Sequence, residues 1–73
     1  MYNILKEMNP RRKAVLALLA NGFVLKRNGK NHDIYYNDSL KRIIPLKRHD
    51  FNDNDLKYIK REIEFARNGG AQR

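Results

Sequence analysis

The fold of this chain is decided by residues 23–36, which read FVLKRNGKNHDIYY. The first five of these residues have the composition of a β-strand. Asn28-Gly29 then gives the strongest short hairpin signal, because both residue types tolerate positive φ. Residues 32–36 read as the returning strand. The stretch therefore predicts an antiparallel hairpin that turns at Asn28-Gly29.

A second turn and a third strand are predicted directly after the hairpin. Residues 37–39, Asn-Asp-Ser, are typical turn formers. Residues 40–46 form the third strand, with Ile43 and Ile44 at its centre. Because Pro45 has no amide hydrogen to donate, we expect it on an edge strand or at the end of the strand.

A first helix is predicted over residues 10–21, before the hairpin. Asn9 is a good cap, and proline at the first helical position loses only an amide that has no partner there. Asn21-Gly22 ends the helix, because glycine accepts the left-handed conformation. The apolar residues of the segment recur at helical spacing: Val15, Leu18 and Leu19, with Leu16 beside them.

The first turn of this helix carries three cations, Arg11, Arg12 and Lys13. They oppose the helix dipole, whose positive end lies at the N-terminus. Such an end forms either a basic rim near a phosphate or a solvated helix end. The sequence leaves both interpretations open.

A second helix follows the third strand. Asn52 or Asp53 can cap it, and Asp55 lies in its first turn. Its apolar residues are spaced +3, +4 and +3 and so share one face: Leu56, Ile59, Ile63 and Ala66. Residues 68–70, Asn-Gly-Gly, end the helix.

The predicted order is α-β-β-β-α. It forms an α+β fold in which two helices pack on one face of a three-stranded antiparallel sheet. We expect one domain over residues 1–73, with an N-terminal arm at 1–8 and a flexible tail at 68–73. A chain of this length buries only about 60% of its unfolded surface. It therefore has no room for a deep substrate cavity, and a surface that meets a macromolecule is favoured.

The chain is strongly basic, with 16 Lys and Arg against 8 acidic residues and a formal charge of +8. Residues 26–49 hold seven of the cations and two Asp, a formal charge of +5. Such a stretch suggests a polyanionic partner. The candidate RNA-binding residues are Lys26, Arg27, Lys30, Asn31, Lys41, Arg42, Lys47 and Arg48. Tyr35 and Tyr36 either stack on unpaired bases, or one faces the core while the other covers the sheet.

Several classes of protein are disfavoured. The chain has no cysteine, which excludes disulfide scaffolds and thiolate zinc sites. A calcium loop beginning at Asp50 fails, because Asp55 replaces the needed glycine and Arg61 the final glutamate. No apolar run is long enough for a signal peptide or a membrane span. We expect a soluble cytoplasmic protein with no metal and no small-molecule cofactor.

His32 is the candidate for chemistry, because it follows the predicted turn among Arg27, Lys30 and Asn31. Histidine exchanges protons near neutral pH. RNA carries its own nucleophile, the 2′-hydroxyl, so its cleavage requires proton transfers and stabilisation of charge at phosphorus. One histidine with cationic neighbours meets that need, although a histidine without chemistry is the commoner case.

The face of the sheet that carries His32 depends on the hairpin loop. Strand alternation places His32 with Ile34 and Tyr36. An even loop would add Phe23, Leu25 and Arg27 to that face and set His32 at the rim of the core. An odd loop would place it on the open face. The sequence leaves the two arrangements open.

Residues 12–66 resemble the HicA toxins, small mRNA interferases of bacterial and archaeal toxin–antitoxin systems. The matching pieces are Leu18-Leu19-x-Asn21-Gly22-Phe23-Val24-Leu25, Gly29-Lys30-Asn31-His32, Ile43-Ile44-Pro45 and Leu56-Lys57-Tyr58-Ile59-Lys60. The order α-β-β-β-α is also the family's and is similar to that of a double-stranded-RNA-binding domain.

The resemblance implies an endoribonuclease that cleaves mRNA without the ribosome and is inhibited by a HicB-type antitoxin. It implies a single essential histidine, which maps onto His32. Lys30 stands where the family usually has serine and is a candidate phosphate contact instead. His49 is a candidate for the second proton carrier. A non-catalytic double-stranded-RNA binder and a protein-interaction module for an acidic partner remain as alternatives.

Overall fold

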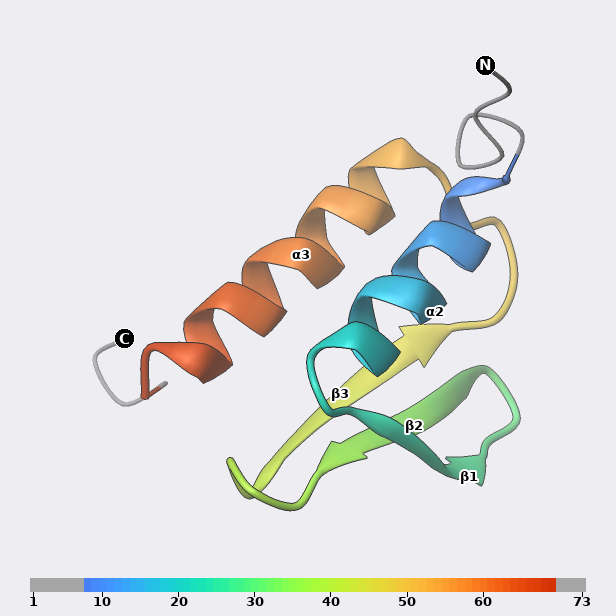
Figure 1. Ribbon diagram of the computed structural model, residues 1–73. Helices are drawn as coiled ribbons and strands as arrows, with labels where there is room; N and C mark the ends of the chain where they lie inside the picture. Colours follow the sequence, from blue (N-terminus) through green and yellow to red (C-terminus); the bar gives the residue numbers. More distant parts are fainter. Residues whose placement is uncertain (1–7, 70–73) are drawn as a thin grey trace.

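The computed structural model of the protein describes residues 8–69, so most of the expected arm at 1–8 and of the expected tail at 68–73 lies outside the described residues. The predicted element order α-β-β-β-α is confirmed (Figure 1). The elements are α2 (Pro10–Ala20), β1 (Val24–Asn28), β2 (His32–Asn37), β3 (Arg42–Lys47) and α3 (Asp53–Arg67). Neither helix of this described part is long and apolar enough to cross a membrane.

The three strands form one antiparallel sheet in the order β1-β2-β3. His32 at the start of β2 lies opposite Lys47 at the end of β3. The register of β1 against β2 shifts between Leu25 and Arg27. Pro45 was expected on an edge strand because it has no amide hydrogen to donate, and β3 is an edge strand.

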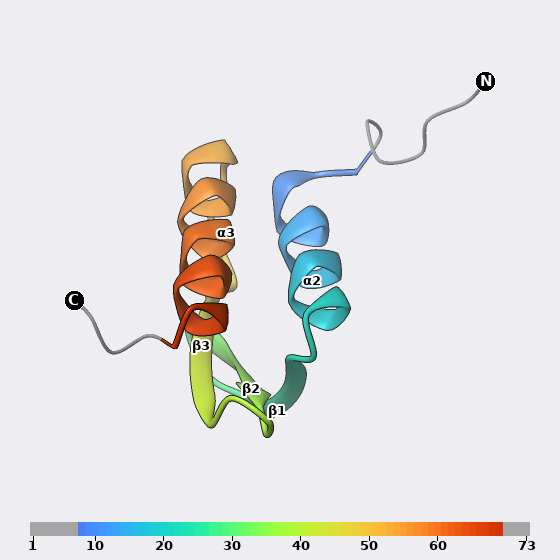
Figure 2. The same cartoon turned by 60° about the vertical axis from the view of Figure 1, so that its left-hand side comes forward.

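The two helices pack side by side on one face of the sheet and run in the same direction (Figure 2). α3 buries the four predicted residues, Leu56, Ile59, Ile63 and Ala66. These join Ala14, Leu18, Phe23, Tyr35, Ile44 and Leu46 in one core. Within residues 8–69 the other face of the sheet carries no helix.

The predicted apolar stripe of α2 is partly wrong. Its buried residues are Ala14 and Leu18, which lie four positions apart and therefore one above the other on the helix. Leu19 keeps 49% of its surface exposed. Since α2 packs mainly against α3, only a narrow strip of its surface enters the core.

The predicted helix ends are confirmed. The Asn9 side chain accepts a hydrogen bond from the Arg12 amide at 2.8 Å. Gly22 has φ +83° and ends the C-terminal turn of α2. Asn52 caps α3 and forms a reciprocal capping box with Asp55. Each cap uses the side chain that the sequence indicated, so both helix starts are set locally.

The hairpin is confirmed, but its expected cause is wrong. Neither Asn28 nor Gly29 has positive φ. The glycine is needed for a close approach instead: its amide donates to the His32 carbonyl at 2.9 Å, and a Cβ at Gly29 would collide with that oxygen. The turn thus depends on a small residue packed on the backbone of His32.

β3 begins two residues later than predicted, at Arg42 rather than Leu40. Lys41 has φ +56°, outside the extended region, so the strand cannot include it. The Asn37 side chain organises this turn by accepting from the Leu40 amide at 2.9 Å. Its amide nitrogen donates to the Asn21 carbonyl at 2.9 Å and so ties the turn to the end of α2.

Candidate nucleic-acid interface

A buried carboxylate anchors the strand that carries His32. Asp33 is 8% exposed and points toward the helices, where its Oδ2 accepts a hydrogen bond from Arg11 Nη2 at 2.7 Å. The Nε of Arg11 also donates to the Lys47 carbonyl at 2.9 Å. Arg11 therefore joins α2 to the ends of β2 and β3. The basic end of α2, left open by the sequence, has a structural use at this position.

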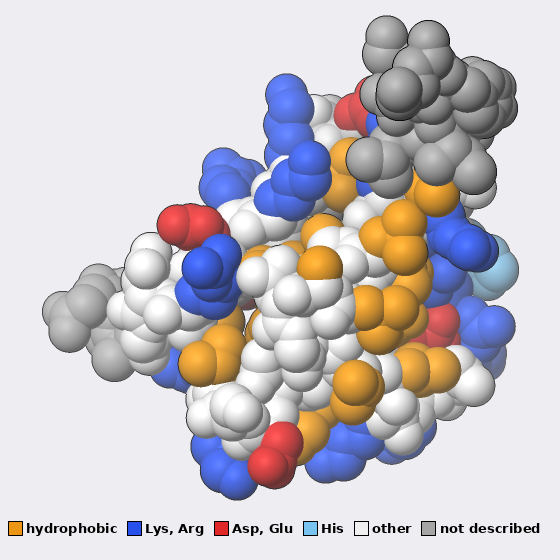
Figure 3. Space-filling model, in the orientation of Figure 1, with side chains coloured by type: hydrophobic (Ala, Val, Ile, Leu, Met, Phe, Trp, Pro, Cys, Tyr) orange, Lys and Arg blue, Asp and Glu red, His pale blue; other side chains and the backbone are white. Residues whose placement is uncertain are grey.

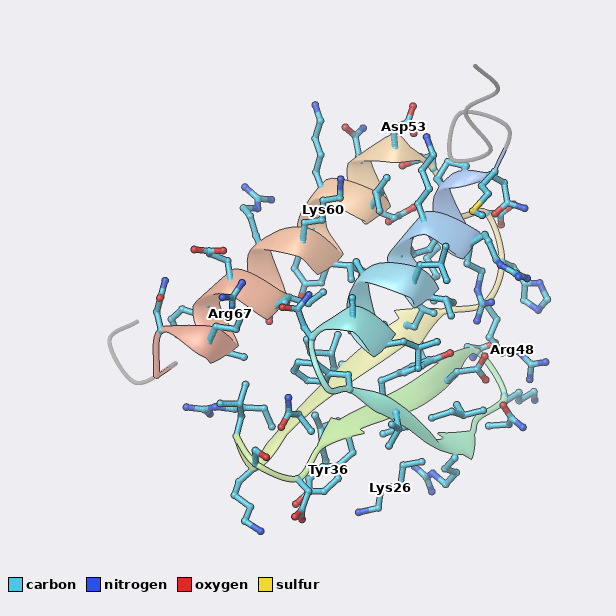
Figure 4. The ribbon with its side chains drawn as sticks, in the orientation of Figure 1. Lys26, Tyr36, Arg48, Asp53, Lys60 and Arg67 are labelled. Atoms are coloured by element: carbon cyan, nitrogen blue, oxygen red, sulfur yellow. The ribbon has the colours of Figure 1, made fainter. Side chains whose placement is uncertain are left out.

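Arg48 makes a second tie beside the first. Its Nε lies 3.6 Å from Asp33 Oδ1, an oxygen that has no hydrogen-bond partner among residues 8–69. Its Nη1 donates to the Gly29 carbonyl at 2.8 Å, and its amide donates to the Asn31 carbonyl at 3.0 Å. The hairpin loop is thus held from both ends by one arginine. Figure 4 shows Arg48 at this end of the sheet.

His32 lies on the open face of the sheet, the side without helices. Asp33, Tyr35 and Asn37 of β2 are buried toward the helices, so the alternate residues face the other way. His32 itself is exposed. Between the paired residues 28 and 33 the loop has four residues, an even number. An even loop was expected to set His32 at the rim of the core, but His32 lies on the open face. The expectation fails because the register shift in β1 places Leu25 and Arg27 on opposite faces.

Several predicted site residues gather near His32. Lys47 is its partner across β3, and Lys30 and Asn31 lie in the adjoining loop. Arg27 lies opposite Ile34, which makes it a diagonal neighbour of His32 at about 7–8 Å between Cα atoms. The open face at this end of the sheet is therefore cationic.

Two predicted residues lie at the other end of the sheet. Arg42 pairs with Asn37, five residues along β2 from His32, a distance of about 17 Å. Its Nη2 donates to the Gly69 carbonyl at 2.7 Å. Lys41 forms an exposed ion pair with Asp38, with 3.3 Å between Nζ and Oδ1. The structure therefore does not bring these two cations together with His32.

The tyrosine pair is divided between the two faces. Tyr35 is in the core, and Tyr36 covers the open face with Lys26 Nζ 4.5 Å from its ring centroid. Figure 4 shows the labelled side chains of Tyr36 and Lys26 on the side of the sheet away from the helices. Because the Lys26 ammonium already occupies one side of the Tyr36 ring, the arrangement favours the structural alternative for this pair over base stacking.

A hollow of about 130 Å³ adjoins His32 at the outer edge of β3, where α3 begins. It is lined by His32, Pro45, Lys47, Phe51, Asp55, Tyr58 and Ile59. Lys47 Nζ lies 3.5 Å from Asp55 Oδ2 within this group. His49 is exposed in the loop after β3 and is not among the lining residues. Sequence reasoning missed the hollow, because its walls come from four separate segments.

The helix face has a different character. Figure 3 shows a band of hydrophobic side chains across this face, with Lys and Arg at its borders. Leu19 of α2 and Leu25 of β1 are among the exposed large hydrophobic residues. A larger hollow of about 420 Å³ lies beside the β2–β3 turn and includes Asn37 and Arg67 in its lining, but neither histidine. His32 and this larger hollow are therefore at different places.

Comparison of the chain with models of known protein families, with curated proteins and with solved structures gives no match.

Proposed function

We propose that this protein is the toxin of a toxin–antitoxin pair of the HicA type, a metal-independent endoribonuclease that cleaves mRNA. The observation that carries the proposal is the position of His32. This exposed histidine starts the central strand on the open face of the sheet, with Lys47 opposite it and a basic loop beside it. The proposal also rests on the resemblance of the segment Gly29–His32 to the family's histidine motif.

The proposed reaction uses the nucleophile that RNA already carries. The 2′-oxygen attacks the adjacent phosphorus, and the bond from phosphorus to the 5′-oxygen breaks. His32 takes the proton from the 2′-hydroxyl as a general base or protonates the departing 5′-oxygen as a general acid. The transition state gathers negative charge at phosphorus, which Arg27 and Lys30 can stabilise.

The backbone around His32 supports a positioning role for the rest of the motif. Gly29 donates to the His32 carbonyl at 2.9 Å, and only glycine fits at that contact. The neighbouring Asp33 is fixed by Arg11 at 2.7 Å. The backbone at His32 is therefore fixed on both sides, which supports a defined starting point for its side chain.

An acidic antitoxin of the HicB type is the proposed partner. A chain with a formal charge of +8 attracts an acidic protein as well as RNA. Such a partner would inhibit the toxin by covering His32 with acidic or apolar groups. We expect the adjacent gene to encode it and both proteins to act in the cytoplasm, where mRNA is found.

Incubation of mRNA with purified protein in EDTA tests the proposal. The wild-type protein should cleave the RNA, and the His32→Ala variant should lose cleavage by at least about a hundredfold. The His49→Ala variant removes an exposed histidine outside the hollow and tests the candidate second proton carrier. Wild-type cleavage by this variant would show that the loss in His32→Ala is specific to His32, and reduced cleavage would assign the second proton transfer to His49.

Two results would overturn parts of the proposal. Unchanged cleavage by His32→Ala would show that His32 takes no part in the reaction. Loss of wild-type cleavage in EDTA would show that the reaction requires a metal ion. RNA that stays intact under all conditions, with salt-sensitive binding retained, would select a non-catalytic double-stranded-RNA binder. The α-β-β-β-α order is the observation that favours this second function. Absence of RNA binding at low salt would select the protein-interaction module.

A further inference from the structure

The hollow beside His32 has the size and the walls of a site for one flat ring. Its volume is about 130 Å³. Pockets for whole drug-sized ligands begin at about 300 Å³. The hollow is therefore too small for a nucleotide with its ribose and phosphate, and it suits a single base.

Apolar side chains form most of this hollow. Phe51 and Tyr58 supply aromatic rings, and Pro45 and Ile59 supply aliphatic surface. Tyr58 is 50% exposed on α3. Aromatic side chains are the platforms on which proteins stack unpaired RNA bases. Tyr58 is thus accessible to a base that enters from outside.

A hydrogen-bond donor and an acceptor lie next to each other in the hollow. Lys47 Nζ, a donor, lies 3.5 Å from Asp55 Oδ2. The capping contact of Asp55 with the Asn52 amide also uses Oδ2, at 2.9 Å. Both of these contacts use Oδ2, and the Asp55 side chain is 28% exposed. The hollow therefore presents the Lys47 ammonium, a donor, beside a carboxylate that can accept further hydrogen bonds.

This pattern complements the pairing edge of guanine. Guanine offers an acceptor, O6, followed by two adjacent donors, N1–H and the N2 amino group. Lys47 can donate to O6 while the Asp55 carboxylate accepts from the two N–H groups. Adenine and cytosine each present one amino donor beside an acceptor, and uracil has one imide donor. Each of these bases would therefore make fewer hydrogen bonds with this pair.

We propose that this hollow binds a guanine base of single-stranded RNA and sets the sequence preference of the protein. The inference rests on the proposed function in one respect: the base it holds belongs to the strand whose phosphate reaches His32. Tyr58 stacks on the base, and Asp55 and Lys47 read its edge. His32 lines the same hollow, so a bound guanine places its own backbone next to the histidine.

Binding of uncleavable RNA tests the site separately from cleavage. The probes are 2′-O-methyl hexamers of sequence UUNUUU, which lack the 2′-hydroxyl nucleophile, measured by fluorescence anisotropy. We expect the hexamer with N = G to bind at least about fivefold more tightly than those with A, C or U. Tyr58→Ala should weaken the binding of the hexamer with N = G about tenfold. Tyr36→Ala, the same substitution on a tyrosine outside the hollow, should leave the preference unchanged.

Two substitutions at the start of α3 separate recognition from folding. Asp55→Asn keeps an oxygen for the helix cap but replaces one acceptor by a donor, so the preference for guanine should disappear. Asn52→Ala removes the cap without touching the hollow, so it should lower stability and keep the preference. Loss of the preference in Asn52→Ala but not in Asp55→Asn would overturn the assignment of Asp55.

The two proposals fail in different ways. Equal binding of all four hexamers would overturn the guanine site, while cleavage that requires His32 would leave the proposed function standing. A guanine preference without any cleavage of ordinary RNA would keep the site and overturn the nuclease.

Discussion

Arg11 in the first turn of α2 and Asp33 in β2 form the shortest ion pair of the described chain, with 2.7 Å between Nη2 and Oδ2. The arginine opposes its own helix dipole, yet it is placed where a buried carboxylate needs a cation. Since Asp33 directly follows His32, this pair fixes the strand at the point where the candidate chemistry begins. The ion pair therefore links the packing of α2 to the geometry of the site.

We expect the Arg11–Asp33 pair to contribute measurably to stability. Its side chains are 30% and 11% exposed, so water screens it less than a surface pair. Asp33→Asn should lower the free energy of unfolding by about 1–3 kcal/mol, because it leaves Arg11 without its charged partner. Urea unfolding of the two single variants and of the double variant Arg11→Ala, Asp33→Asn measures the coupling directly.

The exposed pair Lys41–Asp38 serves as the control. Its side chains are 73% and 85% exposed, and exposed pairs contribute about 0–1 kcal/mol. Equal coupling energies for the two pairs would show that the Arg11–Asp33 contact stabilises the fold no more than an exposed ion pair does.

Gly29→Ala should disrupt the hairpin although Gly29 does not have positive φ. The added Cβ collides with the His32 carbonyl, a backbone atom that can move only with the strand. We expect a loss of about 1–3 kcal/mol in stability, typical of an overpacked site. Backbone amide shifts around His32 should change in the NMR spectrum. Lys30→Ala, one position along the exposed loop, should change neither the stability nor the amide shifts around His32. An unperturbed His32 amide in Gly29→Ala would contradict the role of close packing.

The elements were predictable from the sequence wherever their signals are local. Asn9-Pro10, Gly22 and the Asn52 cap set helix ends through their own backbone or side chains, and each of them lies where it was expected. The apolar spacing of α3 identified its buried face for the same reason. α2 was less predictable, because the neighbouring helix, not the spacing of the leucines, decides which of them is buried.

The site was predictable only in part. Arg27 and Lys30 are close to His32 in sequence, so the hairpin brings them together, whereas Lys47 comes from β3. The partners of Asp33 lie 22 and 15 positions away in the chain, and no local pattern signals a contact of that separation. The face of His32 was also unpredictable, because the shift between Leu25 and Arg27 has no marker residue. The hollow requires the docking of α3 on β3 and appears only in the folded chain.

The neighbouring residues Leu18 and Leu19 should differ sharply in their effect on stability. Leu18 is fully buried, whereas Leu19 is 49% exposed. Leu18→Ala should cost about 2–5 kcal/mol, because it leaves a cavity in the core between the two helices. Leu19→Ala should cost less than about 1 kcal/mol. Thermal or urea unfolding of the two variants compares them in the same helix with the same substitution, and equal losses would contradict the burial of α2.

The two groups of predicted cations should affect RNA differently. Lys30 lies beside His32, whereas Lys41 lies at the other end of the sheet and is paired with Asp38. Lys30→Gln should reduce RNA binding and lower the salt slope, the change of log affinity with log salt concentration, by about 0.7–0.9 for one lost phosphate contact. Lys41→Gln should change the slope less, because that side chain already has a carboxylate partner.

Salt titrations of RNA binding, followed by anisotropy between low and physiological salt, check this difference. The two variants have the same net charge, so a general effect of charge on the whole protein would alter both slopes equally. A larger effect of Lys41→Gln would instead place the RNA across the β2–β3 turn, about 17 Å from His32. At that distance the bound phosphates would lie beyond the reach of the histidine, and the position proposed for the reacting strand would have to be abandoned.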